Sequence, residues 1–278
     1  MEILLEPFRF DFMLRSFAAA IMVGIVCSVI GTFVVVRSMA FLGDALAHAV
    51  LPGVAIAYIF GGNLTVGALI AAIVVAIGIS LLSDQEEIKE DTAIGIFFTA
   101  ALALGIAIIS TIRTYAVDLT HILFGNVLGV TNQDIYFILI TGGIVLLIVV
   151  LFFRFFQVVT FDPVMAKTLN WNVKLIRTIL LVLIAGTITI SINTVGSGLV
   201  TAMLITPAAT ALMFTRKLQT TMLAAACFGA ASGFLGLYIS YFLNISSGAS
   251  IVLTATVFFI IVYSIQKLFP RRNKKVEV

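Results

Sequence analysis

The chain has 278 residues, of which 62% are hydrophobic and 10% are charged, and its mean hydropathy is +1.21. Soluble domains carry about 45–50% apolar and about 25% charged residues, so this composition excludes a soluble fold and indicates a bilayer as the solvent. The net charge of +3 arises without the clustered basic face that nucleic-acid binding requires. We therefore expect a single membrane domain over residues 1–278 and no nucleic-acid partner.

Nine apolar runs separated by polar breaks follow one another along the chain. Each has roughly the 17–25 residues that a helix needs to cross a hydrocarbon core of about 30 Å, and runs of this length do not fit the short alternating strands of a barrel. The sequence predicts an all-α polytopic membrane protein with about nine transmembrane helices. The runs lie near residues 12–36, 44–60, 64–83, 92–112, 134–153, 175–195, 198–215, 219–243 and 250–268.

The distribution of Lys and Arg predicts the orientation. If the basic tail at 267–278 is cytoplasmic and nine spans alternate, thirteen of the 16 Lys and Arg residues lie inside, and Arg9, Arg15 and Arg113 lie outside. Positive-inside sorting favours this arrangement over its inverse. We expect the N-terminus outside and the C-terminus in the cytoplasm.

Small residues and cysteines within the spans indicate packing. Gly229 and Gly233 have the G-x-x-x-G spacing that allows two helix backbones to approach closely. Cys27 and Cys227 both lie in apolar runs, so we expect buried free thiols and no disulfide.

Polar connections separate some of the spans. In the acidic stretch at 84–91, Asp91-Thr92 is expected to cap the following helix, and the stretch itself is expected to be a solvated loop. The external segment at 113–134 is long and half apolar, which favours short helices folded over the mouth of a pathway.

The cytoplasmic segment at 161–173 predicts a short helix. Asp162 suits the cap position and Pro163 the first helical position. Met165, Ala166 and Leu169 then fall on one face, so we expect a docking surface for a cytoplasmic partner.

Ionisable residues are rare inside the spans, and Asp44 and His48 are the sharpest pair. Their i, i+4 spacing puts both on one helix face, and a carboxylate with an imidazole suits a divalent ion such as Mn²⁺ or Zn²⁺. A two-fold homodimer would bring four such ligands together. The alternative is that Asp44 caps the helix and His48 hydrogen-bonds nearby. His121, in the external segment, is either a satisfied polar residue or a candidate external gate.

Enzyme motifs are absent from the sequence. Without H-E-x-x-H the chain lacks the ligands and base of a zinc protease, and without G-x-x-x-x-G-K-[ST] it has no P-loop. If ATP drives transport, a partner must bind it, so we expect a transport subunit that is not itself an enzyme.

Several long motifs in collinear order resemble the permease subunits of bacterial ABC importers for manganese, zinc and related divalent metals, the ABC-3 metal permease family. The likeness covers essentially the whole chain. The stretches that carry it are Arg37 to Tyr58 (RSMAFLGDALAHAVLPGVAIAY), Asp118 to Val130 (DLTHILFGNVLGV), Gly196 to Ala211 (GSGLVTAMLITPAATA) and Asn244 to Ala255 (NISSGASIVLTA).

The resemblance implies an architecture and partners. The fold is expected to be similar to that of metal-chelate and vitamin importers, in the bacterial plasma membrane. Two permease subunits would form a homodimer that works with two cytoplasmic ABC ATPases and an extracytoplasmic metal-binding protein. No cofactor is expected to be bound permanently. The transported ion is expected to be Mn²⁺, with Zn²⁺ or Fe²⁺ as alternatives, because importers of all three metals share these motifs.

The resemblance also assigns residues. Asp44 and His48 match the pair that coordinates the ion in the pathway, and residues 161–173 match the coupling helix that docks on the ATPase. The family usually carries a glycine where this chain has Asn170-Trp171-Asn172.

Two other classes remain as alternatives. One is an ATP-independent secondary cation transporter or channel, a class that places its sites at inverted-repeat interfaces with broken helices. No such repeat is evident in the sequence. The other is an intramembrane metalloenzyme, whose ligands and base are missing.

Overall fold

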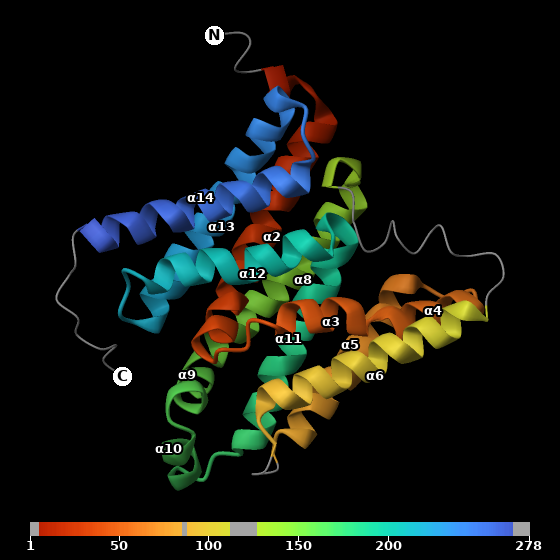
Figure 1. Ribbon diagram of the computed structural model, residues 1–278, viewed down its shortest axis with the longest axis vertical. Coiled ribbons are helices and arrows are strands. Elements are labelled where there is room, and N and C mark those ends of the chain that lie inside the picture. Colours follow the sequence, from red (N-terminus) through yellow and green to blue (C-terminus); the bar gives the residue numbers. More distant parts are fainter. Residues whose placement is uncertain (1–5, 85–87, 112–126, 269–278) are drawn as a thin grey trace.

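The computed structural model describes residues 6–84, 88–111 and 127–268, and every regular element in these ranges is a helix (Figure 1). The elements are η1 (Glu6–Arg9), α2 (Asp11–Val36), α3 (Leu42–Ala49), α4 (Leu51–Ile59), α5 (Leu64–Leu82), α6 (Glu90–Ser110), η2 (Val127–Gly129), α8 (Asn132–Leu151), α9 (Phe153–Phe161), α10 (Pro163–Thr168), α11 (Val173–Val195), α12 (Ser197–Leu212), α13 (Leu218–Leu243) and α14 (Ser247–Leu268).

All nine predicted spans correspond to helical segments of the described chain. Eight of these segments are long and apolar enough to cross a membrane. The ninth, α12, has 16 residues, which at 1.5 Å per residue is about 24 Å and shorter than a typical hydrocarbon core. The all-helical fold is confirmed, and α12 is the one span whose length falls below the usual requirement.

The second span differs from the single continuous helix predicted at 44–60. It begins at Leu42 and is divided at Val50 into α3 and α4. Pro52 lies in the first turn of α4. Proline has no backbone N–H, so it cannot donate to the carbonyl of His48 four residues earlier, and its ring opposes a straight helix there. The two halves together still have the 18 residues of a span.

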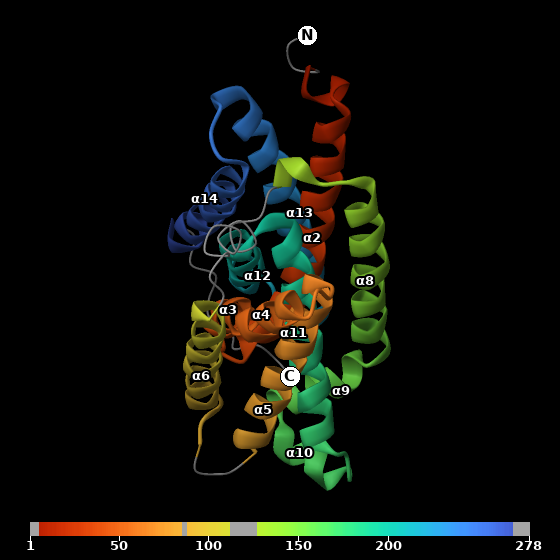
Figure 2. The ribbon, with the colours of Figure 1, turned by 90° about the vertical axis from the view of Figure 1, so that its right-hand side faces the viewer.

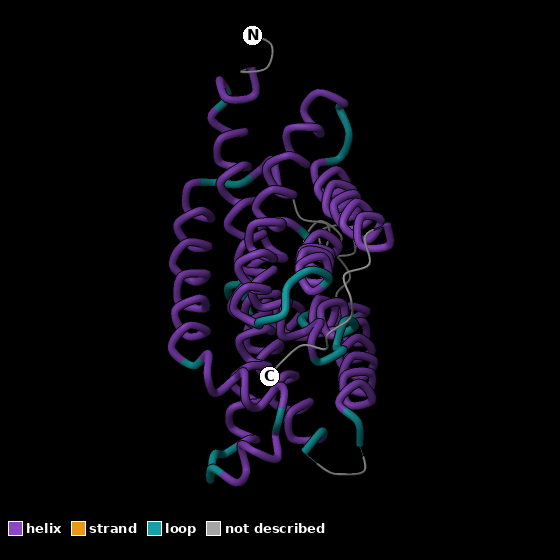
Figure 3. The backbone as a smooth tube through the Cα atoms, turned by 90° about the vertical axis from the view of Figure 1, so that its left-hand side faces the viewer, coloured by secondary structure: helices purple, strands orange, loops and turns teal. Residues whose placement is uncertain are grey.

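Helix α2 forms the centre of the molecule. Most of it is buried, and it contacts α8, α11, α12 and α13. Little of α6, α8 and α14 is buried, as expected of helices at the periphery. Figure 2 shows α8 on one side of the α2–α13 layer and α6 and α14 on the other. Figure 3 shows that the described connections between helices are short.

The predicted close approach at Gly229 and Gly233 is confirmed. A Cβ atom at Gly233 would lie 2.7 Å from the carbonyl oxygen of Ala20, and one at Gly24 would lie 2.6 Å from the carbonyl oxygen of Gly229. Real Cβ atoms do not come this close to backbone, so only glycine allows α2 and α13 to pack at this separation.

Two local predictions are wrong. Cys27 is buried, with its Sγ 3.5 Å from Ser191 Oγ, but Cys227 is exposed on α13. The helix expected to be capped by Asp91-Thr92 instead begins at Glu90, with Lys89 at the cap and no side-chain capping hydrogen bond.

Candidate metal site

Helix α3 presents one uncovered stripe. Six of its eight residues are buried against neighbouring helices, and the two that are not are Asp44 and His48. Their side chains are 47% and 31% exposed. Both face the same direction because residues four apart lie one turn above each other. The charged and imidazole groups therefore form a continuous polar stripe on an otherwise apolar helix.

The two side chains are close enough to share an ion. Asp44 Oδ1 and His48 Nε2 lie 3.6 Å apart, which is too long for a hydrogen bond. A metal about 2.0–2.2 Å from both atoms would see them at an angle of roughly 110–130°, which is near tetrahedral. The alternative in which Asp44 caps the helix is not observed, because the cap residue is Phe41 and no side chain accepts a capping hydrogen bond.

Two phenylalanine rings lie beside the imidazole of His48. The ring centroids of His48 and Phe98 lie 6.1 Å apart, and Phe98 meets Phe41 edge to face at 5.4 Å. Phe98 comes from α6 and Phe41 precedes α3. Sequence reasoning missed both residues, because one phenylalanine among 23 carries no signal in a chain so rich in apolar side chains.

Close packing fixes the orientation of α3. A Cβ atom at Gly43 would lie 3.4 Å from Leu204 Cδ2 and 3.5 Å from Thr201 Cγ2, both on α12. Helix α3 also contacts α5, α6 and α11. Helix α3 is thereby held by its neighbours, while the side chains of Asp44 and His48 stay partly exposed.

One chain supplies only part of a metal site. Among the described residues, no group of three or more His, Cys, Asp or Glu side chains could hold an ion. A tetrahedral ion bound by Asp44 and His48 therefore needs two further ligands from water or another chain. His121, the other histidine of the sequence, lies outside the described residues, so its predicted role is untested.

The short helix predicted at 161–173 is present as α10. Asp162 Oδ1 accepts a hydrogen bond of 2.8 Å from the Met165 N–H, and Pro163 occupies the first turn. Met165 and Leu169 are 49% and 47% exposed. Ala166 differs from the prediction, because it is fully buried in a small cluster with Val159 and Val173.

The end of α10 explains the Asn-Trp-Asn sequence. Asn170 has a φ of 56°, in the left-handed region that glycine usually occupies and that asparagine tolerates. The N–H groups of Asn170 and Trp171 bond to the carbonyls of Lys167 and Ala166, at 3.0 and 3.1 Å. This is the Schellman pattern of helix ends, so asparagine replaces glycine with the turn intact.

The remaining two residues of that sequence join α10 to α11. The Trp171 ring packs on Phe155 with a centroid distance of 4.6 Å. The Asn172 side chain caps α11 by accepting a 3.0 Å hydrogen bond from Leu175 N–H. The α10–α11 corner is therefore held by the Schellman turn, the ring contact and the helix cap.

Comparison with known proteins identifies a family and relatives of this chain. Residues 9–266 match the ABC 3 transport family. The manganese transport system membrane protein MntC of Halalkalibacterium halodurans is 46% identical over 254 residues, which cover 91% of this chain and 87% of that protein. A "Probable iron transport system membrane protein" of Haemophilus influenzae is 35% identical, covering 99% of this chain and 98% of that protein.

Solved structures show the same fold. PsaBC from Streptococcus pneumoniae in complex with Fab has a chain that superposes with a TM-score of 0.82 and 37% identity, covering 96% of this chain and 99% of that one. An inward-facing metal-chelate type ABC transporter superposes with a TM-score of 0.72 at 16% identity, covering 91% of this chain and 86% of that one. The expected similarity to the metal-chelate importer fold is confirmed.

The family match spans nearly the whole chain. The described part of the chain has eight helices long and apolar enough to cross a membrane, as expected of a relative of transport-system membrane proteins. The chain is thus a multi-pass bacterial membrane permease that belongs to the ABC 3 transport family.

Proposed function

We propose that this chain is the membrane-spanning subunit of an ATP-driven importer that carries a divalent transition-metal ion, with Mn²⁺ as the preferred cargo, into the cell. The observation that carries the proposal is the stripe of Asp44 and His48 on a helix whose other residues are buried. The relative that is 46% identical is named as a manganese transport protein, which supports Mn²⁺ as the cargo. The relative named as a probable iron transport protein makes Fe²⁺ the alternative cargo. Zn²⁺ fits the same two ligands.

The complete site is proposed to form between two copies of the chain. Two subunits related by a two-fold axis would contribute two carboxylates and two imidazoles. Such a set satisfies a hard or borderline divalent ion, and the mixed ligands bind moderately, which a carrier that must release its cargo requires. The exposure of both side chains leaves them free to meet a second copy.

The energy is proposed to come from two cytoplasmic ABC ATPase subunits, because the chain has no P-loop of its own. An extracytoplasmic binding protein would deliver the ion. ATP binding would move α10 on each subunit and switch the pathway from outward- to inward-facing. The distribution of Lys and Arg supports a cytoplasmic position for α10, because four basic residues lie in it or close to it in the sequence: Arg154, Lys167, Lys174 and Arg177.

Reconstitution tests the proposal against its main rival, a secondary cation transporter. Proteoliposomes containing the permease, its ATPase and the binding protein should accumulate ⁵⁴Mn²⁺ when ATP is enclosed on the cytoplasmic side. A matched preparation with a hydrolysis-deficient ATPase should accumulate none. Equal accumulation by the permease alone, driven by an ion gradient, would identify a secondary transporter instead.

A further inference from the structure

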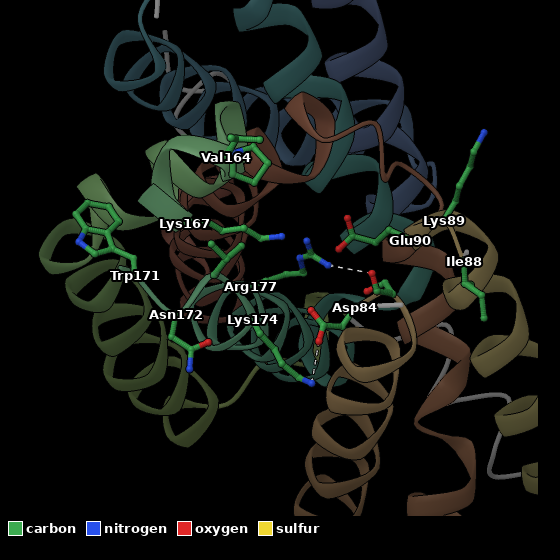
Figure 4. Close-up of a pocket in the computed structure, with 13 residues that line it drawn as sticks. Asp84, Ile88, Lys89, Glu90, Val164, Lys167, Trp171, Asn172, Lys174 and Arg177 are labelled. Atoms are coloured by element: carbon green, nitrogen blue, oxygen red, sulfur yellow. Dashed lines mark hydrogen bonds and ion pairs between the residues drawn. The ribbon is translucent and has the colours of Figure 1, made fainter. Parts of the chain in front are cut away.

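A polar cavity of about 570 Å³ lies beside α10. Its walls come from the α5–α6 connection on one side and from α10 and the start of α11 on the other (Figure 4). Both walls are formed where helices end, and the lining is rich in charged side chains. This cavity lies outside the Asp44–His48 site, and the transport mechanism described above does not use it.

The cations of the cavity outnumber its anions. Four basic side chains and two carboxylates line it. Both carboxylates already have partners: Asp84 Oδ2 lies 2.9 Å from Lys174 Nζ, and Glu90 is held by Nη2 of Arg37 at 2.9 and 3.0 Å. Among the described residues, no carboxylate forms an ion pair with Lys167 or Arg177.

Lys167 and Arg177, which form no ion pair within the described ranges, converge. In Figure 4 the Lys167 ammonium and the Arg177 guanidinium point toward each other and toward Glu90, whereas Lys89 points away. The Nη1 of Arg177 donates to the carbonyl of Ser83 at 3.1 Å, but its buried Nε has no partner in the described structure. Positive charge is therefore concentrated at one point in the cavity.

A second guanidinium, that of Arg37, is paired with Glu90 and lies close enough to Arg177 to feel its charge. The Arg37 side chain is only 10% exposed, and its Nη1 is buried without a partner in the described part of the chain. Burial lowers the pKa of Arg37 and so does the neighbouring Arg177, while Glu90 raises it. Two neighbouring guanidinium groups thus have only one ion-paired carboxylate between them, that of Glu90 on Arg37, an arrangement that favours the arrival of a second anion.

We propose that this cavity receives an acidic side chain of the cytoplasmic subunit that docks on α10, with Lys167 and Arg177 as its partners. The inference rests on the proposed function, because that function supplies the docking subunit. Arg177 offers a directional N–H donor and Lys167 a point charge, a combination suited to a carboxylate. The exposed apolar side chains of Met165 and Leu169 lie on the same short helix, so one partner can cover both.

The proposed contact would connect docking to the transport helices. Arg177 lies near the start of α11 and holds the end of α5 through Ser83, while Glu90 begins α6, whose Phe98 contacts His48. A carboxylate between Lys167 and Arg177 would tie α10 to these helix ends. The partner would then pull on α5, α6 and α11 as well as on α10.

Lys167→Gln is the variant that tests the proposal. Lys167 is exposed and its side chain forms no ion pair within the described structure, so its loss should leave the fold intact. Lys217→Gln is the matched control, because Lys217 is also exposed and lies on the same proposed cytoplasmic side. The measurement is the affinity of the purified ATPase for the permease in nanodiscs of zwitterionic lipid, over a series of salt concentrations.

The expected result is about tenfold weaker ATPase binding by Lys167→Gln, with a flatter salt dependence than the wild type. Lys217→Gln should match the wild type. Lys167→Glu should bind more weakly still, and one Glu→Lys or Asp→Lys variant of the ATPase docking groove should restore its affinity. Wild-type affinity and salt dependence in Lys167→Gln would overturn the proposal, whereas failure of the wild type to bind any ATPase would overturn the proposed function itself.

Two other sources of the anion are separated by the same assay. If Lys167 matters only in nanodiscs containing anionic phosphatidylglycerol, a lipid headgroup fills the cavity and the proposal is wrong. Glu86 and Glu87 lie outside the described residues of the α5–α6 connection. If replacing both by Gln abolishes the effect of Lys167→Gln, the carboxylate comes from this chain, and the proposal is again wrong.

Discussion

Asp44 Oδ1 and His48 Nε2 lie 3.6 Å apart on successive turns of α3, and they are the two residues of that helix that stay partly exposed. A carboxylate and an imidazole so placed in a membrane protein need a reason to stay exposed. A passing cation, held jointly with a second subunit, supplies that reason.

Changing the carboxylate to a thiol should change the preferred metal. Asp44→Cys replaces a hard oxygen ligand by a soft sulfur ligand, which favours Zn²⁺ over Mn²⁺. The ratio of Zn²⁺ to Mn²⁺ uptake should rise by about tenfold. Competition uptake of both metals measures this ratio, with Asp91→Cys, on the exposed first turn of α6, as the control. An unchanged ratio would mean that Asp44 does not touch the ion.

Variants at a buried and at an exposed position of α10 should have different effects, one on stability and the other on coupling. Ala166 is fully buried, so Ala166→Trp should overpack the cluster around Val159 and Val173 and destabilise α10. Met165 is half exposed, so Met165→Ala should leave the melting temperature unchanged and reduce the coupling of ATP hydrolysis to transport. Thermal unfolding and the ratio of ions moved to ATP hydrolysed are the two measurements. The assignment fails if Met165→Ala retains full coupling.

The α2–α13 contact should not tolerate a methyl group. Gly24→Ala places a Cβ against the carbonyl of Gly229, so we expect a loss of about 1–3 kcal/mol in stability. Gly143→Ala on α8 is the control, since a Cβ there meets nothing within 4 Å, and it should be neutral or slightly stabilising. Denaturation of the purified protein in detergent checks both. Equal stability of the two variants would show that the helices are further apart.

The ion pair of Asp84 and Lys174 should make the stability of the folded protein depend on pH. The hydrogen bond from Lys174 lowers the pKa of Asp84 below its ordinary value of 3.8, so the folded state favours the ionised carboxylate. The stabilisation is fully present above that ordinary value and is lost as the pH falls through the lowered folded-state pKa. The melting temperature of Asp84→Asn should therefore lie slightly below that of the wild type at neutral pH.

The difference in melting temperature between the wild type and Asp84→Asn should persist down to about pH 5. It should disappear only below the ordinary pKa of 3.8. The gap is small because both side chains are partly exposed. A gap that closes near pH 6 would assign the effect to another group.

Local signals made much of the fold predictable. The spans follow from apolar length, and the start of α10 follows from Asp162 and Pro163, because capping acts within one turn. The exposure of Cys227 and the burial of Ala166 could not be predicted in the same way. Lipid is as apolar as a protein interior, so an apolar helix does not reveal which face meets its neighbours.

The candidate site also has a part that local sequence predicts and a part that it does not. Asp44 and His48 are one turn apart, so spacing alone predicts their shared face. The contact of Phe98 with His48 and the ion pair of Arg37 with Glu90 join residues about 50 positions apart in the chain. Such pairs depend on how helices pack, which a single sequence does not specify.

The most direct test is ⁵⁴Mn²⁺ accumulation by proteoliposomes that contain His48→Ala permease together with the ATPase and the binding protein. Loss of the imidazole should abolish accumulation while ATPase binding stays at the wild-type level. Wild-type accumulation by His48→Ala would contradict the claim that the stripe on α3 holds the transported ion.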